Sequence, residues 1–238
     1  MVSPYARPLK TQGAEGRVAH AVVKLSRGAE REYRMLRAAT HARVVHADHA
    51  PGVLIMPAAD TDLLALVQAG PLEPERTWRL LADLRDAVFA IHTRGIVHRD
   101  VKLENVLVYG DRAKLGDFGY ATFLKRAETL TETRGTPGYV APEIMRREPY
   151  DHKVDVFSFG VCCFAACTRQ MPFDKRGPRA RIPGIARLDA LDLTDARRTA
   201  VESALRFSAA DRASSLDLAR LRLLGEPLRL EARPGDKA

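Results

Sequence analysis

The chain has 238 residues, of which 46% are hydrophobic and 29% are charged, and this composition excludes wholesale disorder. Lys and Arg number 38 against 30 Asp and Glu, which gives a net charge of +8. Because most of the basic residues are Arg and they are scattered along the chain, the charge does not indicate a nucleic-acid interface.

The first part of the chain predicts mostly strands with one helix. Residues 18–25 are rich in β-branched side chains and predict one or two strands. Residues 29–39 carry good helix formers at helical spacing. Residues 44–45 and 53–56 predict two further strands, since a turn with Pro51 and Gly52 precedes the second.

From about residue 60 onward the pattern is helical. The predicted helices cover 62–68, 73–94 and 154–166, followed by three shorter ones near 184–190, 194–207 and 213–224. We therefore predict an α+β fold, with one domain over 1–238. It would consist of a small β-rich lobe over about 1–59, a larger helical lobe over about 60–238 and a hinge near 57–61.

The three cysteines, Cys162, Cys163 and Cys167, lie within one apolar stretch. We expect them to be buried thiols on a core helix in a reducing compartment. The stretch is too short to cross a membrane, and residues 1–7 contain no apolar segment typical of a secretion signal. The sequence therefore predicts a soluble intracellular protein of the cytoplasm or nucleus, with no membrane contact.

Three short motifs follow one another in the larger lobe. They are His98-Arg99-Asp100-Val101-Lys102-Leu103-Glu104-Asn105, Asp117-Phe118-Gly119 and Ala141-Pro142-Glu143. In this order they resemble the signature set of the eukaryotic protein kinases, H-R-D-x-x-x-x-N, D-F-G and A-P-E. The resemblance covers about 11–224 and implies the two-lobed protein-kinase-like fold. It also implies transfer of the γ-phosphoryl group of ATP, with Mg²⁺, to Ser or Thr hydroxyls of protein substrates.

The resemblance assigns chemical roles to four residues of these motifs. Asp100 would orient the substrate hydroxyl or accept its proton, and Lys102 would stabilise charge on the transferred phosphoryl group. Asn105 and Asp117 would hold Mg²⁺, which prefers oxygen ligands and keeps other positions for water and phosphate.

The phosphate-binding end is predicted from residues 11–18, which fit the kinase glycine-rich loop with Thr11 at the first glycine position. Gly13 and Gly16 would let backbone amides approach the phosphates. Lys24 matches the strand lysine that contacts the α- and β-phosphates. Both connections, from Val18 to Lys24 and from Lys24 to the next helix, are shorter than in the family.

Lys24 is expected to pair with a helix glutamate. Glu32 is the choice that fits the family's pattern, and Glu30 is the alternative. The resemblance further places several residues around the adenine ring, with Met56 at the back of the pocket or Ile55 in its place. Those that would cover the ring or donate and accept backbone hydrogen bonds are Val18, Val22, Leu107, Met56 and Ala58.

Other family positions predict structural contacts. Asp155 matches the aspartate that anchors the catalytic loop, and Glu143 is expected to pair with Arg212 in a buried site. Arg99 is expected to need a negatively charged partner on the activation segment, the stretch of chain between the Asp117-Phe118-Gly119 and Ala141-Pro142-Glu143 motifs. Glu132 lies where the family commonly carries a phosphorylated residue, so we predict a Glu132–Arg99 pair. The alternative is that Thr131 or Thr133 takes a phosphate.

Substrate type is indicated by Lys102 and by Gly-Thr-Pro-Gly-Tyr at 135–139, both typical of serine/threonine kinases. Glu104 matches a position that recognises substrate arginine, and Asp60 and Asp62 are candidates to add to it. Short segments near 13–16, 54–57 and 61–63 resemble compact herpesvirus kinases, which would place the protein in a host cell.

Two further interpretations stay open from the sequence. A pseudokinase, acting as an interaction module with weak or no catalysis, is suggested by Thr11 and by the shortened connections. A nucleic-acid binder built on a kinase scaffold would rest on net charge alone. We expect a monomer whose partners are protein substrates.

Overall fold

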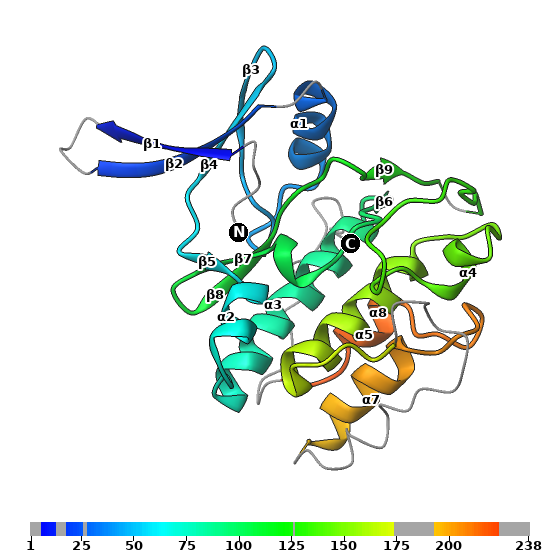
Figure 1. Ribbon diagram of the computed structural model, residues 1–238. Coiled ribbons are helices and arrows are strands. Elements are labelled where there is room, and N and C mark those ends of the chain that lie inside the picture. Colours follow the sequence, from blue (N-terminus) through cyan, green and yellow to red (C-terminus); the bar gives the residue numbers. More distant parts are fainter. Residues whose placement is uncertain (1–5, 13–17, 26–27, 126, 174–192, 224–238) are drawn as a thin grey trace, which may run out of the picture.

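The computed structural model describes residues 6–12, 18–25, 28–125, 127–173 and 193–223. A small lobe of strands and one helix stands above a larger helical lobe (Figure 1). The chain passes from the first lobe to the second between Pro57 and Thr61. This is the predicted α+β, two-lobed architecture.

The small lobe contains a four-stranded antiparallel sheet in the order β1-β2-β4-β3, together with helix α1. Its elements are β1 (Ala6–Gln12), β2 (Val18–Leu25), α1 (Ala29–Ala38), β3 (Asp48–Ala50) and β4 (Val53–Pro57). The residues predicted as one or two strands therefore form one continuous strand, β2. The helix predicted over 29–39 is confirmed as α1, whose first turn carries Glu30 and Glu32 at the end where negative charge is favoured.

The strand predicted at 44–45 is wrong. Val44 and Val45 are 3% and 2% exposed, and they meet the larger lobe instead of the small sheet. Val44 forms an isolated bridge with Leu115, and the Val45 amide donates to the Leu115 carbonyl at 2.9 Å. Their apolar side chains are buried at the junction of the lobes, and β3, a little later in the chain, takes the place beside β4.

The larger lobe is built mainly from helices. They are α2 (Leu63–Ala69), α3 (Pro74–His92), the 3₁₀ turn η1 (Leu103–Asn105), α4 (Pro142–Met145), α5 (Lys153–Thr168), α7 (Asp195–Ala204) and α8 (Ser215–Ala219). Its short strands are β5 (Thr61–Asp62), β6 (Ile96–Val97), β7 (Val106–Tyr109), β8 (Arg112–Leu115) and β9 (Thr122–Phe123). They form two small sheets, β5-β7-β8 and β6-β9.

These helices confirm most of the predicted ones. α2 begins after Asp62, whose side chain accepts from the Ala65 amide, and α3 begins after Glu73 with Pro74 in its first turn. The helix predicted over 213–224 is shorter than expected, because α8 ends at Ala219. The predicted helix near 184–190 lies outside the described residues.

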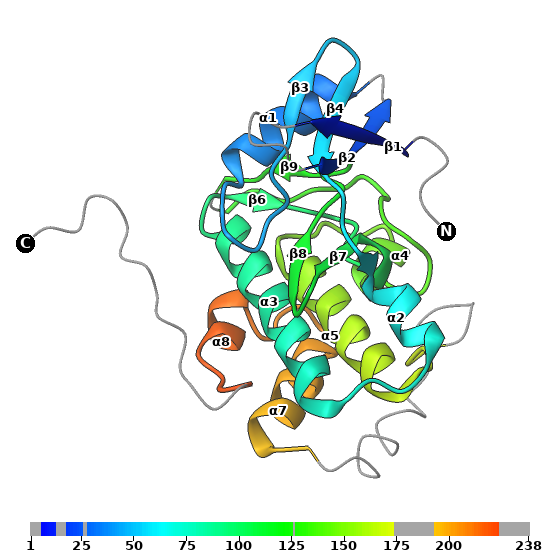
Figure 2. The same ribbon diagram turned by 90° about the vertical axis from the view of Figure 1, so that its left-hand side faces the viewer.

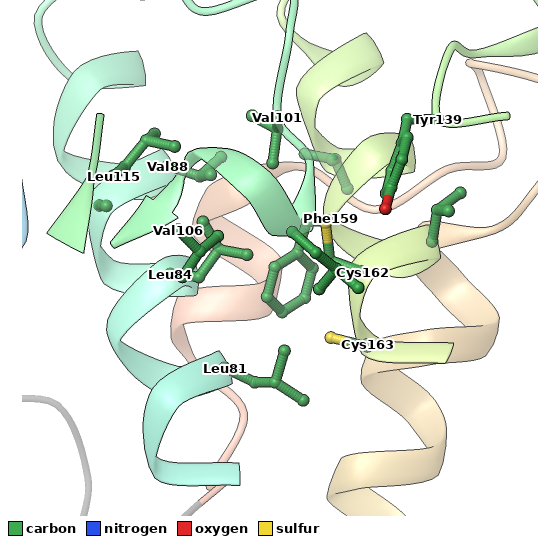
Figure 3. Packing of buried hydrophobic residues seen from close by; sticks show 14 of the residues in the cluster. Leu81, Leu84, Val88, Val101, Val106, Leu115, Tyr139, Phe159, Cys162 and Cys163 are labelled. Carbon is green, nitrogen blue, oxygen red and sulfur yellow. The ribbon is translucent and has the colours of Figure 1, made fainter. Parts of the chain in front are cut away.

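The core of the larger lobe lies between α3 and α5, which run side by side (Figure 2). Leu81 and Leu84 of α3 project toward Phe159 and Cys162 of α5 (Figure 3). Cys162 and Cys163 are fully buried, which raises the pKa of both thiols well above the ordinary value and confirms the structural role expected of them. Among the described helices, none is long and apolar enough to span a bilayer.

The predicted Glu143–Arg212 pair is confirmed and joins α4 to the segment before α8. Arg212 donates from Nη1 to Oε1 at 2.6 Å and from Nη2 to Oε2 at 2.9 Å, so the pair is bidentate. The side chains are 0% and 5% exposed. Arg212 also donates to the carbonyls of Lys153, Arg206 and Phe207, so its three remaining protons have partners.

Removing one partner of this pair should destabilise the fold, because the other charge would stay buried without a counter-charge. We expect Glu143→Gln to lower the free energy of unfolding by about 3–5 kcal/mol in chemical denaturation. Glu148→Gln is the matched control, since Glu148 pairs with Arg146 at the surface, where both side chains are about half exposed. Equal unfolding midpoints for the two variants would contradict the prediction.

Candidate active site

The loop that carries Asp100 is held from below by the carboxylate of Asp155 on α5. Its Oδ2 accepts the His98 amide at 2.7 Å and contacts His92 Nε2 at 3.0 Å, while its Oδ1 accepts the Arg99 amide at 2.8 Å. Burial alone would raise the pKa of Asp155, but the donors outweigh it and hold the pKa below the ordinary value. The predicted anchoring role of Asp155 is therefore confirmed.

Two residues of this site have left-handed backbone conformations. The φ of Arg99 is 67° and that of Asp117 is 57°, although neither is a glycine. Such conformations cost about 1–3 kcal/mol each and persist where the surroundings impose them. At Arg99 the imposing group is Asp155, whose bonds to two successive amides fix the turn before Asp100.

Asp100 lies at the centre of a small hydrogen-bonded group. The Thr136 hydroxyl donates to Asp100 Oδ1 at 2.7 Å, and Lys102 Nζ lies 3.1 Å from Asp100 Oδ2. Lys102 also donates to Thr136 Oγ1 at 2.9 Å. The amide nitrogen of Asn105 donates to the Asp100 carbonyl at 2.8 Å. The structure thus brings the predicted residues Asp100, Lys102 and Asn105 together.

The small lobe contributes Lys24 of β2 and Glu32 of α1. Lys24 Nζ lies 3.0 Å from Glu32 and 2.8 Å from Asp117 Oδ1, so the predicted Lys24–Glu32 pair is confirmed and is extended to the larger lobe. Glu30, the alternative, instead pairs with Arg34 along the same helix.

Burial and neighbouring charges shift the pKa values of Lys24, Glu32 and Asp117 in opposite directions. Burial disfavours a charged Lys24, but the carboxylates of Asp117 and Glu32 outweigh it and raise the pKa of the lysine. Partial burial would raise the pKa of Asp117, and Lys24 instead brings it below the usual value. Burial raises the pKa of Glu32, with Lys24 opposing the rise. The short contacts to Lys24 favour the ionised carboxylates.

The donor set offered by Asn105 and Asp117 fits a magnesium ion. Both supply hard oxygen atoms, and the amide nitrogen of Asn105 is already used by the Asp100 carbonyl. Within the described ranges no group of three or more His, Cys, Asp or Glu side chains could enclose a metal. Two side-chain ligands would leave other coordination positions of a Mg²⁺ ion to water and phosphate.

Several residues predicted around adenine lie where the two lobes approach each other. Val22 of β2 is opposite Met56 of β4 in the sheet register. Met56 packs against the core, whereas Ile55 is 37% exposed, which favours Met56 over the alternative. Leu107 lies on β7 in the larger lobe. Ala58 follows the last strand of the small lobe and is partly buried.

The strand ends that flank the predicted glycine-rich loop lie far from Lys24 along the β1–β2 hairpin. Thr11 and Val18 lie at the end of the β1–β2 hairpin where Gln12 pairs with Val18, while Lys24 pairs with Ala6 at the other end. At ~3.3 Å per residue, the six steps from Val18 to Lys24 span roughly 20 Å. The hairpin accordingly points away from the larger lobe (Figure 1).

The short connection between Val18 and Lys24 explains this separation. With no turn between Val18 and Lys24, residues 18–25 continue as one strand and carry their first residues away from the site. Gly13 and Gly16 lie outside the described residues.

The activation segment is held by the predicted Glu132–Arg99 pair. Arg99 Nη1 donates to Glu132 Oε2 at 2.9 Å, and this hydrogen bond and the arginine's charge lower the pKa of Glu132. Arg99 Nε also donates to the Tyr120 carbonyl at 2.7 Å, and the Tyr150 hydroxyl donates to the Glu132 carbonyl at 2.7 Å. The Arg99 side chain is 4% exposed, so its charge depends on these partners.

Close approach of this segment to the catalytic loop requires a glycine. At Gly135 φ is 116°, and a Cβ atom there would lie 2.8 Å from the Arg99 carbonyl oxygen. The next residue, Thr136, can then reach Asp100. Sequence reasoning used Thr136 only as a marker of substrate type and missed this contact, although its position after Gly135 was the available signal.

Comparisons with known proteins agree with this geometry. Residues 17–208 match the family model described as the protein kinase domain. Serine/threonine-protein kinase pkn2 of Myxococcus xanthus is 34% identical over 177 residues, which cover 67% of this chain and 21% of that protein. CBL-interacting serine/threonine-protein kinase 2 of Arabidopsis thaliana is 35% identical over 162 residues, covering 63% and 36% respectively. The herpesvirus resemblance stays a prediction.

Breaking the Glu132–Arg99 pair should loosen the activation segment. We expect Glu132→Ala to speed amide hydrogen exchange over residues 127–136, because Arg99 would lose the one carboxylate partner that its side chain has among the described residues. Thr131→Ala and Thr133→Ala are the neighbouring controls and should leave exchange unchanged. Faster exchange in the threonine variants with none in Glu132→Ala would contradict the prediction.

Proposed function

The chain belongs to the protein kinase family, and we propose that it is an active serine/threonine kinase that uses Mg-ATP. The observation that carries the proposal is the position of Lys24, which contacts Glu32 of the small lobe and Asp117 of the larger lobe at once. Phosphoryl transfer depends on positioning and on charge neutralisation, and this contact aligns the charged groups of both lobes. The chain spans 21% and 36% of the two relatives described above, so activities of those whole proteins are not transferred.

The proposed mechanism gives each residue a task. Lys24 would bind the α- and β-phosphates of ATP, and Asn105 and Asp117 would hold the metal ion. Bound Mg²⁺ would neutralise charge on the phosphates. Asp100 orients the substrate hydroxyl and receives its proton as the new phosphate ester bond forms and ADP leaves. Lys102, 3.1 Å from Asp100, balances charge near the transferred group.

A protein substrate is supported by a cavity beside the Gly135–Thr136 turn. The cavity has a volume of about 290 Å³, and its lining includes Tyr120, Val140 and Met145. Tyr120 and Met145 are exposed large side chains, at 44% and 41%. Apolar side chains beside Thr136, which touches Asp100, suit contact with a polypeptide next to its acceptor hydroxyl.

Preference for arginine in the substrate is proposed from Glu104. Its Oε2 is buried and has no hydrogen-bond partner among the described residues, although the carboxylate contacts the Tyr139 side chain. A buried acceptor of this kind is suited to a charged donor. Asp60 and Asp62 are weaker candidates than predicted, because they accept the backbone amides of Gly110 and Ala65, respectively.

A pseudokinase is the second candidate, and one observation favours it. Val18 lies roughly 20 Å along β2 from Lys24, at ~3.3 Å per residue, and Thr11 lies close to Val18 on the paired strand β1, so the strand ends that flank the predicted phosphate loop are far from the lysine. Under this alternative the chain would bind partners through the same lobes without turnover. The two candidates differ in whether γ-phosphate is transferred.

Purified chain incubated with γ-labelled Mg-ATP and a generic basic protein should label that protein. We expect Asp100→Asn to lower the rate by about 100-fold or more, because the hydroxyl loses its proton acceptor. Lys24→Met should abolish transfer while leaving the fold largely intact. Asp48→Asn is the control, since Asp48 is the first residue of β3 and its side chain is 80% exposed. Equal labelling by wild type and Asp100→Asn would refute the enzyme assignment.

Peptide libraries should reveal the proposed arginine preference. Peptides with Arg two or three residues before the acceptor should be phosphorylated fastest, and Glu104→Gln should reduce that advantage by about tenfold, because it removes the charge facing the guanidinium. Glu148→Gln, at an exposed pair elsewhere, should keep the preference. Selection of acidic or proline-directed peptides would remove Glu104 from substrate recognition.

A further inference from the structure

We propose that Arg31 is a positioning residue that fastens helix α1 to the segment following Asp117, so that the site assembles without modification of the chain. The inference rests on the proposed function and adds a means of regulation to it. Arg31 stands next to Glu32 on α1, and its guanidinium reaches the larger lobe. Neither the motifs nor the resemblance pointed to this residue.

The contacts of Arg31 are directed at main-chain atoms. Nη1 donates to the Gly119 carbonyl at 3.1 Å, and Nη2 donates to the Ala121 carbonyl at 2.9 Å. The carbonyl between them, that of Tyr120, accepts Arg99 Nε at 2.7 Å. Three successive carbonyls therefore accept hydrogen bonds from two arginines, one from each lobe.

This arrangement links three parts of the site. Glu32, beside Arg31, contacts Lys24 at 3.0 Å, and Lys24 contacts Asp117 at 2.8 Å. Because Arg31 binds the chain just after Asp117, a rotation of α1 that releases Glu32 would also break the Arg31 contacts. The Lys24–Glu32 pair and the Arg31 contacts therefore both depend on the same orientation of α1.

The chemistry of arginine suits this role. Its planar fork donates to two carbonyls two residues apart, whereas the single ammonium of a lysine is a point donor. The residue is exposed on the outer surface of α1, so its loss removes little packing. The guanidinium of Arg31 binds main-chain carbonyls, so these contacts form without a phosphate group on the segment. Arg99 is likewise already paired with Glu132.

Arg34 provides a matched control on the same helix. It lies one turn further along α1, its side chain is 70% exposed, and it pairs with Glu30 within the helix. No contact between Arg34 and the larger lobe occurs in the described part of the chain. Arg31→Gln and Arg34→Gln therefore remove the same charge from the same helix, and only the first removes contacts to the segment.

The test uses the full chain after phosphatase treatment, with its unphosphorylated state checked by mass spectrometry. We expect wild type to stay active and Arg31→Gln to lower kcat about tenfold with an unchanged Tm, the size expected for losing hydrogen bonds from a charged donor. Arg31→Lys should recover part of the loss, and Arg34→Gln should match wild type. Loss of wild-type activity on phosphatase treatment, equal losses in both Gln variants, or a fall in kcat that follows Tm would overturn the proposal.

Hydrogen exchange separates this proposal from the proposed function. If wild type transfers no phosphate before phosphatase treatment, the enzyme assignment fails, but the link between α1 and the segment can still be measured. Amide exchange over 117–123 should then be faster in Arg31→Gln than in Arg34→Gln, because only the first variant frees the carbonyls of Gly119 and Ala121. Equal exchange in the two variants would refute the positioning role.

Discussion

The buried carboxylate of Asp155 is the interaction on which the rest of the site depends. It lies on α5, the helix at the centre of the larger lobe, and it accepts the amides of His98 and Arg99. These bonds impose the left-handed backbone of Arg99 and fix the direction of the chain into Asp100. A rigid apolar helix thereby transmits its position to the catalytic loop, and the strain at Arg99 is offset by hydrogen bonds in a site of low dielectric constant.

From this fixed loop, charge pairs extend in two directions. Arg99 reaches Glu132 and holds the activation segment, which in turn brings Thr136 to Asp100. On the other side Asp117 of the larger lobe contacts Lys24 of the small lobe, which also pairs with Glu32. In each pair one side chain is largely buried, so the charges are compensated by their partners and little by water. These pairs therefore fix the positions of the two lobes and of the activation segment relative to one another.

The contacts that could be predicted from the sequence are those between residues at positions of the kinase pattern. Asp155, the Glu143–Arg212 pair and the Glu132–Arg99 pair were predicted because these residues match positions of the kinase pattern, with Glu132 placed three residues before Gly135. Local pattern failed where tertiary contacts decide: the apolar pair 44–45 has strand propensity but packs across the lobe junction beside Leu115. Arg31 was also missed, because its partners are main-chain carbonyls, which carry no sequence signal. The continuous strand from Val18 to Leu25 agrees with the short connection between Val18 and Lys24 that the sequence shows.

The most direct test of this account is a crystal structure of the chain with Mg²⁺ and a non-hydrolysable ATP analogue. The account predicts a metal ion bound by oxygen atoms of Asn105 and Asp117, with Lys24 moved from Asp117 onto the phosphates and still paired with Glu32. It also predicts that Asp100 keeps its place above Asp155, with the adenine between Val22 and Leu107. A structure at saturating nucleotide in which the cleft binds neither metal nor phosphate at these residues would contradict it.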